Sequence, residues 1–345
     1  MKNRILIAGV IMVLMLGACS PELKTLTVMT HDSFAVSDEI IAFFEQENGV
    51  KINFLFGGDA GGMLNKAILS KDAPVADILY GVDNTFLSRA LEEGIFEPYR
   101  SPMLEDIPDE FILDKEFGAL PVDFGDVCIN VDVGFFKERA LPFPTTLEDL
   151  TQPEYQGMLV VQNPATSSPG LAFLLATIAE YGRDGYLDYW ARLKDNGVVV
   201  VNDWETAYYV NFSGSSGQGP QPMVVSYGTS PAAEVIFSEE PVTAAPTQSL
   251  TGKNMCFRQI EFAGILSGTK NRELAEIFID YMLSQKFQED IPLNMFVFPV
   301  NRNARVPDEF VEFIQVPEEP ASLPLLEISG ERENWIEAWR QLMLR

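Results

Sequence analysis

The stretch LTVMTHDSFAVSDEIIAFFEQENGVKINFLFGG (Leu26–Gly58) contains the pattern that decides the fold. Leu26–Met29 predicts a strand, Ser37–Glu47 predicts a helix with Ser37 at its N-cap, and Lys51–Phe56 predicts a second strand. A helix between two strands is the usual connection between parallel neighbours in a sheet. The chain therefore begins its folded part as an α/β structure.

The same alternation continues beyond Gly58. We expect a helix over Met63–Ser70, a strand over Ala76–Tyr80 and a helix over Thr85–Glu93. Two strand–helix–strand units in succession indicate a parallel sheet with helices on both faces.

A second block of elements begins near Val122. Its expected strands are Val127–Val131, Leu159–Gln162, Val198–Val201, Met223–Ser226 and Cys256–Leu266. Its expected helices are Gly170–Tyr181, Gly185–Asn196, Glu205–Phe212, Pro231–Phe237, Arg272–Ser284 and Glu331–Leu344. The pattern predicts two α/β lobes, each a mostly parallel sheet flanked by helices. We expect residues 25–122 plus 260–330 in lobe 1, residues 123–259 inserted as lobe 2, and residues 331–345 as a C-terminal helix.

The N-terminus has the features of an export signal. Lys2 and Arg4 precede an apolar run of 14 residues, Ile5–Ala18, which is shorter than the roughly 20 residues that span a bilayer. The run ends in Leu-Gly-Ala before Cys19, a box typical of bacterial lipoproteins, although a plain secretory signal with an incidental cysteine is the alternative. We expect residues 1–18 to be a signal peptide, Cys19 to receive lipid, and residues 19–24 to be a linker that tethers the protein outside the cytoplasm.

Two further cysteines, Cys128 and Cys256, remain after Cys19. They pair in an oxidising compartment, or both are small core residues. We favour two buried thiols, because both lie in apolar strand-like contexts and a chain of this length needs no disulfide to stabilise its core.

The formal net charge of −26 limits the kinds of partner that the protein can bind. Such an acidic protein would be repelled by nucleic-acid phosphates, so nucleic acid is excluded as a partner. The charge is compatible with a cationic ligand, and surface solubility explains it equally well.

The turns after the strands carry the candidate binding residues, because open α/β sheets bind ligands beyond the carboxyl ends of their strands. The turns of the first lobe contribute six candidates: His31, Asp32, Ser33, Asp59, Gly61 and Asp83. Asp32 and Ser33 are also suited to shape their turn, and Asp83 is suited to cap the next helix. The glycine-rich turn Gly57–Gly62 lacks the spacing of a nucleotide-binding loop.

The second lobe contributes an anion site and two aromatic rings. Ser167 and Ser168 open a helix, where free backbone N–H groups and the helix dipole favour a phosphate or carboxylate. Trp204 and Tyr227 follow two strands, and together they suggest an aromatic cage for a flat or cationic ligand.

Several runs resemble, in order, those of thiamine-binding proteins of ABC transporters. They are VMTHDSFA (Val28–Ala35), DILYGVDN (Asp77–Asn84), LPVDFGD (Leu120–Asp126), QNPATSSPGLAFLL (Gln162–Leu175), DWETAY (Asp203–Tyr208), VVSYGTSPA (Val224–Ala232), IPLNMFVFPV (Ile291–Val300) and WIEAWRQ (Trp335–Gln341). The resemblance implies the type II periplasmic binding-protein fold and the role of a monomeric solute-binding subunit. Its ligand would be thiamine or a thiamine phosphate ester, and its membrane partner a complex of permease and ATPase.

The resemblance also implies roles for individual residues. Asp59 would contact the cationic ligand, Trp204 would stack on the thiazolium ring, and Tyr227 would line the cleft. Ser167 and Ser168 would hold the phosphate group of an ester.

Four positions depart from the family pattern. The family has a tyrosine at His31, a tryptophan at Asp38, a pyrimidine-stacking tyrosine at Ala233 and a tryptophan at Phe296. We still expect Phe296 to contact the ligand. The loss of a stacking partner at Ala233 would cost about 1–3 kcal/mol of binding free energy or accompany a remodelled pocket.

Other functions fit the sequence less well. A polyamine or another organic cation suits the acidic and aromatic residues. The adjacent Tyr208 and Tyr209 resemble those of ferric-ion binders, but the chain has a single histidine and few converging oxygen ligands. A lipoprotein hydrolase would need a nucleophile elbow, and the sequence has no G-x-S-x-G. We therefore expect a binding protein without a cofactor or metal, and not an enzyme.

Overall fold

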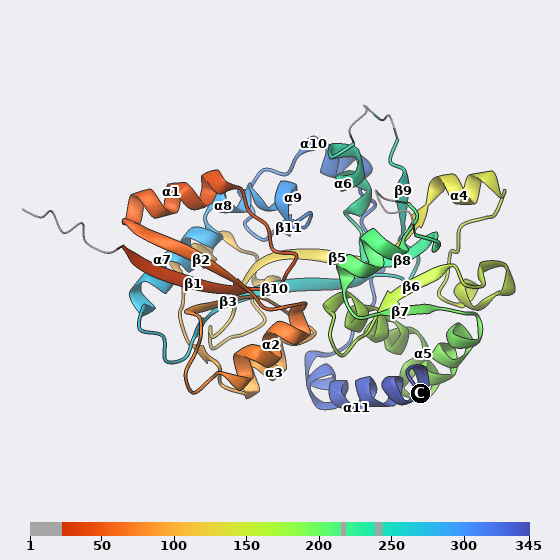
Figure 1. Ribbon diagram of the computed structural model, residues 1–345, viewed down its shortest axis with the longest axis horizontal. Coiled ribbons are helices and arrows are strands. Elements are labelled where there is room, and N and C mark those ends of the chain that lie inside the picture. The colour runs from red at the N-terminus through yellow and green to blue at the C-terminus, as the bar shows by residue number, and fades with distance from the viewer. Residues whose placement is uncertain (1–22, 215–218, 239–241, 243) are drawn as a thin grey trace, which may run out of the picture.

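The computed structural model describes residues 23–214, 219–238, 242 and 244–345, and its strands lie in one mixed sheet (Figure 1). The expected signal peptide and Cys19 lie outside the described residues. The sheet has 11 strands in the described part of the chain, with the main order β2-β1-β3-β10-β5-β8-β6-β7. Three short strands lie off this order: β4 (Phe96–Glu97) pairs with β10, and β9 (Thr247–Leu250) and β11 (Phe298–Pro299) pair with β5.

One half of the sheet forms the core of the first lobe. Its parallel strands are β2 (Val50–Phe56), β1 (Lys24–Thr30) and β3 (Ile78–Asp83). Successive side chains of β1 face opposite sides, so Leu26 and Val28 join one hydrophobic core while Met29 joins another. One core includes helices α1 (Asp38–Asn48) and α7 (Arg272–Leu283), and the other includes α2 (Ala60–Leu69) and α3 (Leu87–Glu92). The prediction of an α/β sheet covered on both faces is confirmed.

The other half of the sheet forms the core of the second lobe. Its parallel strands are β8 (Met223–Tyr227), β6 (Leu159–Gln162) and β7 (Val199–Val201). The long helix α5 (Ser168–Asp195) packs against them and contains both helices expected in this region. Gly182, with φ 71° and ψ 175°, interrupts its helical geometry, and glycine adopts this φ without steric cost.

Two long strands, β5 (Leu120–Asp132) and β10 (Phe257–Leu266), run antiparallel through the middle of the sheet. β10 pairs with β3 of the first lobe, and β5 pairs with β8 of the second lobe. The lobe boundaries that we expect at residues 122 and 260 fall inside these two strands. The lobes are therefore joined through continuous strands.

Cys128 and Cys256 form a disulfide with an S–S distance of 2.10 Å, so the expectation of two buried thiols is wrong. Cys128 lies in β5, and Cys256 directly precedes β10. The register that pairs Val127 with Phe257 brings the Cα atoms of the two cysteines to 4.2 Å. Buried thiols and buried disulfides both occur in apolar surroundings. Only the register of the strands shows that these two cysteines are close enough to bond.

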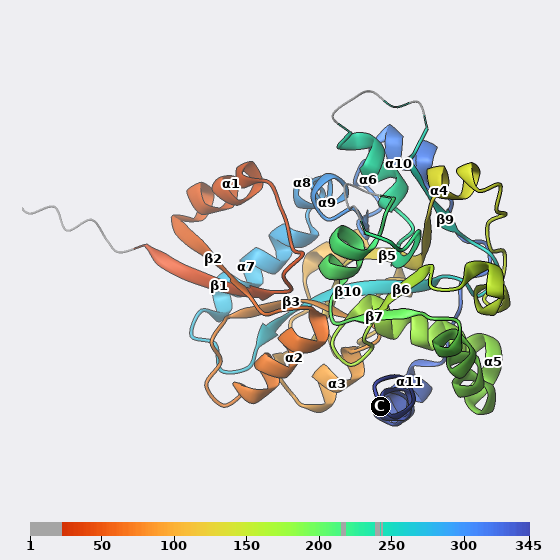
Figure 2. The ribbon, with the colours of Figure 1, turned by 45° about the vertical axis from the view of Figure 1, so that its right-hand side comes forward.

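The C-terminal helix α11 (Leu325–Met343) begins six residues before the expected start at Glu331. Pro324 precedes its first turn, where the fixed φ of proline suits a helix start. Trp339 packs edge-to-face on Trp190 of α5 at 5.4 Å, and the Arg332 guanidinium donates to the carbonyl oxygen of Thr85 beside α3. The helix therefore contacts both lobes along one side of the molecule (Figure 2).

The remaining helices are short. They are α4 (Val133–Glu138), α6 (Ser230–Ile236), α8 (Gln285–Gln288), α9 (Ile291–Asn294) and α10 (Asp308–Phe313), with 3-10 turns at Pro102–Asp106, Asp109–Phe111, Glu148–Thr151 and Pro153–Tyr155. No helix in the described part of the chain is long and apolar enough to cross a bilayer.

Candidate ligand-binding site between the lobes

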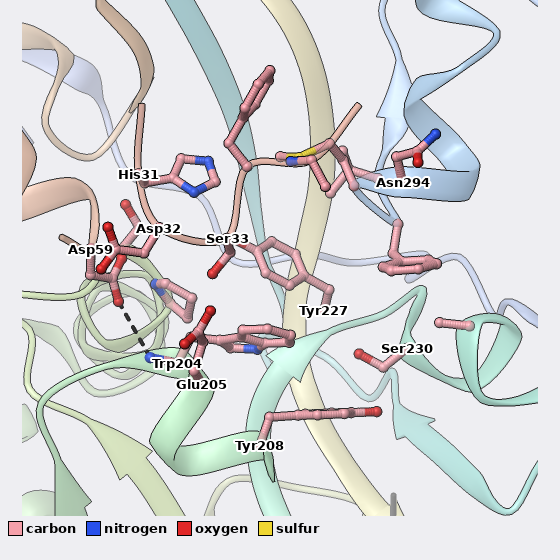
Figure 3. Close-up of a pocket in the computed structure, with 18 of the residues that line it drawn as sticks. His31, Asp32, Ser33, Asp59, Trp204, Glu205, Tyr208, Tyr227, Ser230 and Asn294 are labelled. Atoms are coloured by element: carbon pink, nitrogen blue, oxygen red, sulfur yellow. Dashed lines mark hydrogen bonds between the residues drawn. The ribbon is translucent and has the colours of Figure 1, made fainter. Parts of the chain in front are cut away.

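A cavity of about 530 Å³ lies between the two lobes (Figure 3). The first lobe contributes the turns after β1 and β2, and the second lobe contributes the start of α5, the segment after β7, and α6. The segment from Asn294 to Val297 closes a further side. This is the position beyond the strand ends where open α/β sheets bind ligands.

Most of the residues that the sequence singled out meet at this cavity. Eight of the eleven expected binding residues line it: His31, Asp32, Ser33, Asp59, Ser168, Trp204, Tyr227 and Phe296. Gly61, Asp83 and Ser167 do not line it. Asp32 joins its turn to the neighbouring turn after β2, because its Oδ1 accepts a hydrogen bond from Gly58 N–H at 2.8 Å.

Gly61 allows the two lobes to pack closely. A Cβ atom at this position would lie 3.1 Å from the carbonyl oxygens of Ala165 and Thr166, which belong to the turn before α5. The absence of a side chain therefore lets α2 approach the second lobe closely.

Asp83 lies buried beneath the cavity and binds the second lobe. Its carboxylate accepts hydrogen bonds from the hydroxyl of Ser168 and from Gln259 Nε2, while Thr85 N–H donates to its other oxygen. Asp83 thus shapes the turn before α3 rather than capping the helix itself, since the N-cap residue is Phe86. Burial raises the pKa of Asp83 to about 6, against the effect of these hydrogen bonds.

The hydrogen bonds of Asp83 change the anion site that we expected at Ser167 and Ser168. Ser168 directs its hydroxyl group to Asp83, and Ser167 is fully buried beside the cavity. An incoming phosphate at the start of α5 would therefore meet the carboxylate of Asp83, to which the hydroxyl of Ser168 already donates.

His31 faces a carboxylate that the sequence did not point to. Its side chain is buried, and Nε2 lies 3.5 Å from Oε1 of Glu261 on β10. Burial by itself would lower the pKa of His31, but Glu261, with Asp59 and Asp83 further away, raises it. His31 therefore carries a positive charge more readily than a free histidine, and the charge is balanced by the cavity's own acids.

A buried hydrogen-bond chain extends from Glu261 away from the cavity. The hydroxyl of Tyr80 lies 2.5 Å from Oδ2 of Asp123 and 2.9 Å from Oε2 of Glu261. One hydroxyl proton cannot serve both carboxylates, so one carboxyl group carries its own proton. Burial and the charge of Glu261 raise the pKa of Asp123 well above its usual range, whereas the charge of His31 keeps the pKa of Glu261 low despite its burial. Asp123 is thus the protonated member.

Asp59 caps α2 and reaches the second lobe. Its Oδ1 accepts a hydrogen bond from Ala60 N–H at 2.7 Å, and its Oδ2 accepts one from Trp204 N–H at 3.3 Å. Burial raises the pKa of Asp59, and the neighbouring donors, including Ser167, oppose this effect. The carboxylate remains at the wall of the cavity, within reach of a cation.

Trp204 is held as a flat platform in the cavity wall (Figure 3). One face of the indole stacks on Tyr208 at 5.1 Å with an interplanar angle of 19°, and Nε1 donates to Ser226 Oγ at 2.9 Å. Tyr227 lies edge-on at 6.3 Å. Among the described residues no second ring stacks on the indole, so its other face can take a planar ligand.

The helix expected over Glu205–Phe212 is a π-helix, Thr206–Asn211. π-helical turns are rare and occur often at functional sites. Here the turn places both Tyr208 and Tyr209 at the cavity.

Carboxylates dominate the charge of the cavity. Its acidic residues are Asp32, Asp59, Glu205, Glu234 and Glu261, and His31 is the single basic residue among the described residues that line it. No group of three or more His, Cys, Asp or Glu residues in the described ranges is arranged to hold a metal ion. The cavity is therefore suited to an organic cation with a flat ring.

Sequence reasoning missed Glu234, Glu261 and the direct part played by Tyr208. The sequence contains one indication of a role for Glu261. It is a lone acidic residue inside an apolar strand, and a buried acidic residue must be paired. Tyr208 and Glu234 lie inside segments predicted to be helices, and no local sequence pattern identified them as binding residues.

A mixed sheet shared by two lobes, with a cavity between them at the strand ends, defines a type II periplasmic binding protein. Residues 73–312 match the model of the family described as bacterial extracellular solute-binding protein, and the chain belongs to this family. Its members are carriers of solutes outside the cytoplasm, so the protein is an extracytoplasmic binding protein and not an enzyme.

Individual relatives are similar over nearly the whole chain. The chain is 28% identical to the thiamine-binding periplasmic protein of Brucella suis biovar 1 (strain 1330), over 91% of both chains. It is 28% identical to the protein of the same name from Escherichia coli (strain K12), over 93% of this chain and 94% of that one. A solved structure of a periplasmic thiamin binding protein superposes with a TM-score of 0.82 at 26% identity, covering 94% of this chain and 98% of that chain.

Proposed function

We propose that the protein is the solute-binding subunit of an ABC importer and that it captures thiamine or a thiamine phosphate ester between its lobes. The observation that carries the proposal is the indole of Trp204, which offers one open face in a cavity rich in carboxylates. The thiazolium ring of thiamine is a flat cation, and an aromatic face attracts such a cation by about 2 kcal/mol or more when the contact is desolvated. The names of the relatives support the same ligand.

The contacts in the cavity favour the vitamin over its esters. Asp59 and Glu234 lie at the cavity wall, and no lysine or arginine of the described residues joins them there. His31, the basic residue at the wall, already faces Glu261, so a phosphate group would lose its hydration without gaining an unpaired cationic partner. Thiamine itself carries only a neutral hydroxyl on its tail, so it meets no such penalty.

We further propose that the mature protein is a monomer anchored by a lipid on Cys19. The proposal rests on the apolar run before Cys19 and on Leu16-Gly17-Ala18 beside it. The disulfide between Cys128 and Cys256 supports export, because disulfides persist in oxidising compartments.

Isothermal titration calorimetry tests the ligand assignment. Purified protein should bind thiamine at a stoichiometry of one, and a polyamine such as spermidine, which lacks a ring to stack on Trp204, should bind far more weakly. Mass spectrometry of the small molecules that co-purify with the protein provides an independent identification. Tight binding of spermidine without binding of thiamine would favour the alternative of an organic-cation carrier.

A further inference from the structure

Glu234 is a cavity carboxylate whose charge the protein does not balance. It lies on α6, lines the cavity, and accepts a hydrogen bond through Oε1 from the hydroxyl of Tyr208 at 2.7 Å. No lysine, arginine or histidine in the described part of the chain forms an ion pair with it, and no described residue donates to its Oε2. A half-buried carboxylate without a cation costs free energy until a ligand supplies donors.

The other acids deep in the cavity are already satisfied. Glu261 faces His31 and accepts a hydrogen bond from Tyr80. Asp59 accepts two backbone N–H groups, those of Ala60 and Trp204. Glu234 therefore differs from them in having one oxygen free for the ligand.

Glu234 stands at the edge of the aromatic platform. Tyr208 stacks beneath Trp204, and the hydroxyl of the same tyrosine holds Glu234. The neighbouring Ala233 has only a methyl group at the cavity wall, and Phe237 packs edge-to-face on Phe296 at 5.2 Å nearby. Since Trp204, Ala233 and Glu234 line the same cavity of about 530 Å³, a second flat ring beside Trp204 would lie within reach of Glu234.

We infer that Glu234 determines specificity by accepting a hydrogen bond from an amino group on the second ring of the ligand. This inference rests on the proposed function, since thiamine carries an aminopyrimidine ring next to its thiazolium ring. A carboxylate oxygen accepts from N–H but repels a carbonyl oxygen in the same place. The site should therefore select a 4-amino ring against the corresponding 4-oxo ring.

Oxythiamine, which has an oxo group in place of that amino group and keeps the thiazolium cation, is the matched probe. Dissociation constants of thiamine and oxythiamine are measured by calorimetry on the full-length protein and on Glu234→Gln. The unmodified protein should prefer thiamine by roughly tenfold or more, the size expected for one hydrogen bond to a charged group. In Glu234→Gln the preference should fall to about twofold or less, because a glutamine amide can donate to the oxo group as well as accept from the amino group.

Two controls separate a specific effect from a general one. Glu309→Gln on α10 removes the same charge from an exposed side chain outside the cavity and should keep the full preference for thiamine. Circular dichroism and thermal unfolding show whether Glu234→Gln is folded, and Glu234→Asp, which keeps the charge, should retain part of the preference if the glutamine variant is unstable.

The outcomes distinguish this inference from the proposed function. Equal affinities of thiamine and oxythiamine for the unmodified protein, or an undiminished preference in Glu234→Gln, would overturn the role of Glu234 while leaving thiamine as the ligand. Failure of the unmodified protein to bind either compound would overturn both.

Discussion

The backbone N–H of Trp204 donates a hydrogen bond to Oδ2 of Asp59 at 3.3 Å, and this bond joins one lobe to the other (Figure 3). It connects the aromatic face that would stack on the ligand with a carboxylate that would balance the charge of the ligand. Because Asp59 also caps α2 through Ala60 N–H, its position is set by the first lobe. The two halves of a cation site are thus assembled only when the lobes are close together.

Replacement of Trp204 should weaken thiamine binding most strongly. Trp204→Ala removes the stacking face and should raise the dissociation constant about thirtyfold, since each factor of ten corresponds to about 1.4 kcal/mol. Trp204→Phe should fall between, because it keeps a smaller ring. Thiamine should also quench the emission of Trp204, and fluorescence titration of the three proteins measures both effects. An unchanged affinity in Trp204→Ala would make Trp204 a structural residue.

Thiamine should bind more tightly than its monophosphate, and the monophosphate more tightly than the diphosphate. The reason is the carboxylate-rich cavity, in which Ser168 already donates to Asp83. We expect a step of about tenfold for the first phosphate, the cost of roughly one unpaired charged group. Calorimetry with the three compounds checks the order. The reverse order would restore Ser167 and Ser168 as a phosphate site, and alanine at both positions should then weaken only the esters.

Loss of the disulfide should lower stability without abolishing the fold. Cys128 and Cys256 close a loop with a sequence separation of 128, and removal of such a cross-link typically costs about 2–5 kcal/mol of the free energy of unfolding. The double variant Cys128→Ala/Cys256→Ala should therefore unfold at a lower urea concentration than the parent protein. Alkylation of the unreduced, denatured protein should leave both cysteines unlabelled, and labelling of either would contradict the disulfide.

Asp83 should make stability depend on pH in the mildly acidic range. Burial raises the pKa of Asp83 to about 6 in the folded protein, while an aspartate in an unfolded chain titrates near about 3.9. The folded state therefore binds more protons between these values, and the free energy of unfolding should fall by up to about 3 kcal/mol as pH rises through them.

Asp83→Asn should remove this dependence, because asparagine stays neutral at every pH. The variant can keep its contacts, since Gln259 has a buried Oε1 without a partner that can accept from the new amide. Urea unfolding of both proteins at about pH 4 and at about pH 7 measures the free energy of unfolding. At the higher pH the variant should gain stability relative to the parent protein. Parallel pH profiles would show that Asp83 does not titrate in this range.

Cys19→Ala should release the protein from the membrane. A lipid chain on Cys19 would supply the apolar anchor, and the described residues contain no helix that could replace it. After fractionation of expressing cells, the parent protein should sediment with membranes and the variant should remain soluble. An unlipidated parent protein with an intact N-terminus would contradict the anchor.

The sequence by itself determined the α/β architecture and eight of the residues that line the cavity. Both are local properties: the spacing of apolar residues in Leu26–Phe56 already distinguishes strand from helix, and a strand end brings the following turn to the edge of the sheet. His31, Asp59, Trp204 and Tyr227 could be identified because each lies at the end of a strand or shortly after it.

Only the tertiary structure decided how distant segments meet. The disulfide depends on the register of β5 against β10, which brings Cys128 and Cys256 together. The raised pKa of His31 depends on Glu261, which lies on a strand far along the chain. The hydrogen bond from Tyr208 that leaves one oxygen of Glu234 for a ligand likewise depends on how α6 lies beside the π-helix. Register and packing are set by the whole core, so no local pattern in the sequence encodes which side chains they bring into contact.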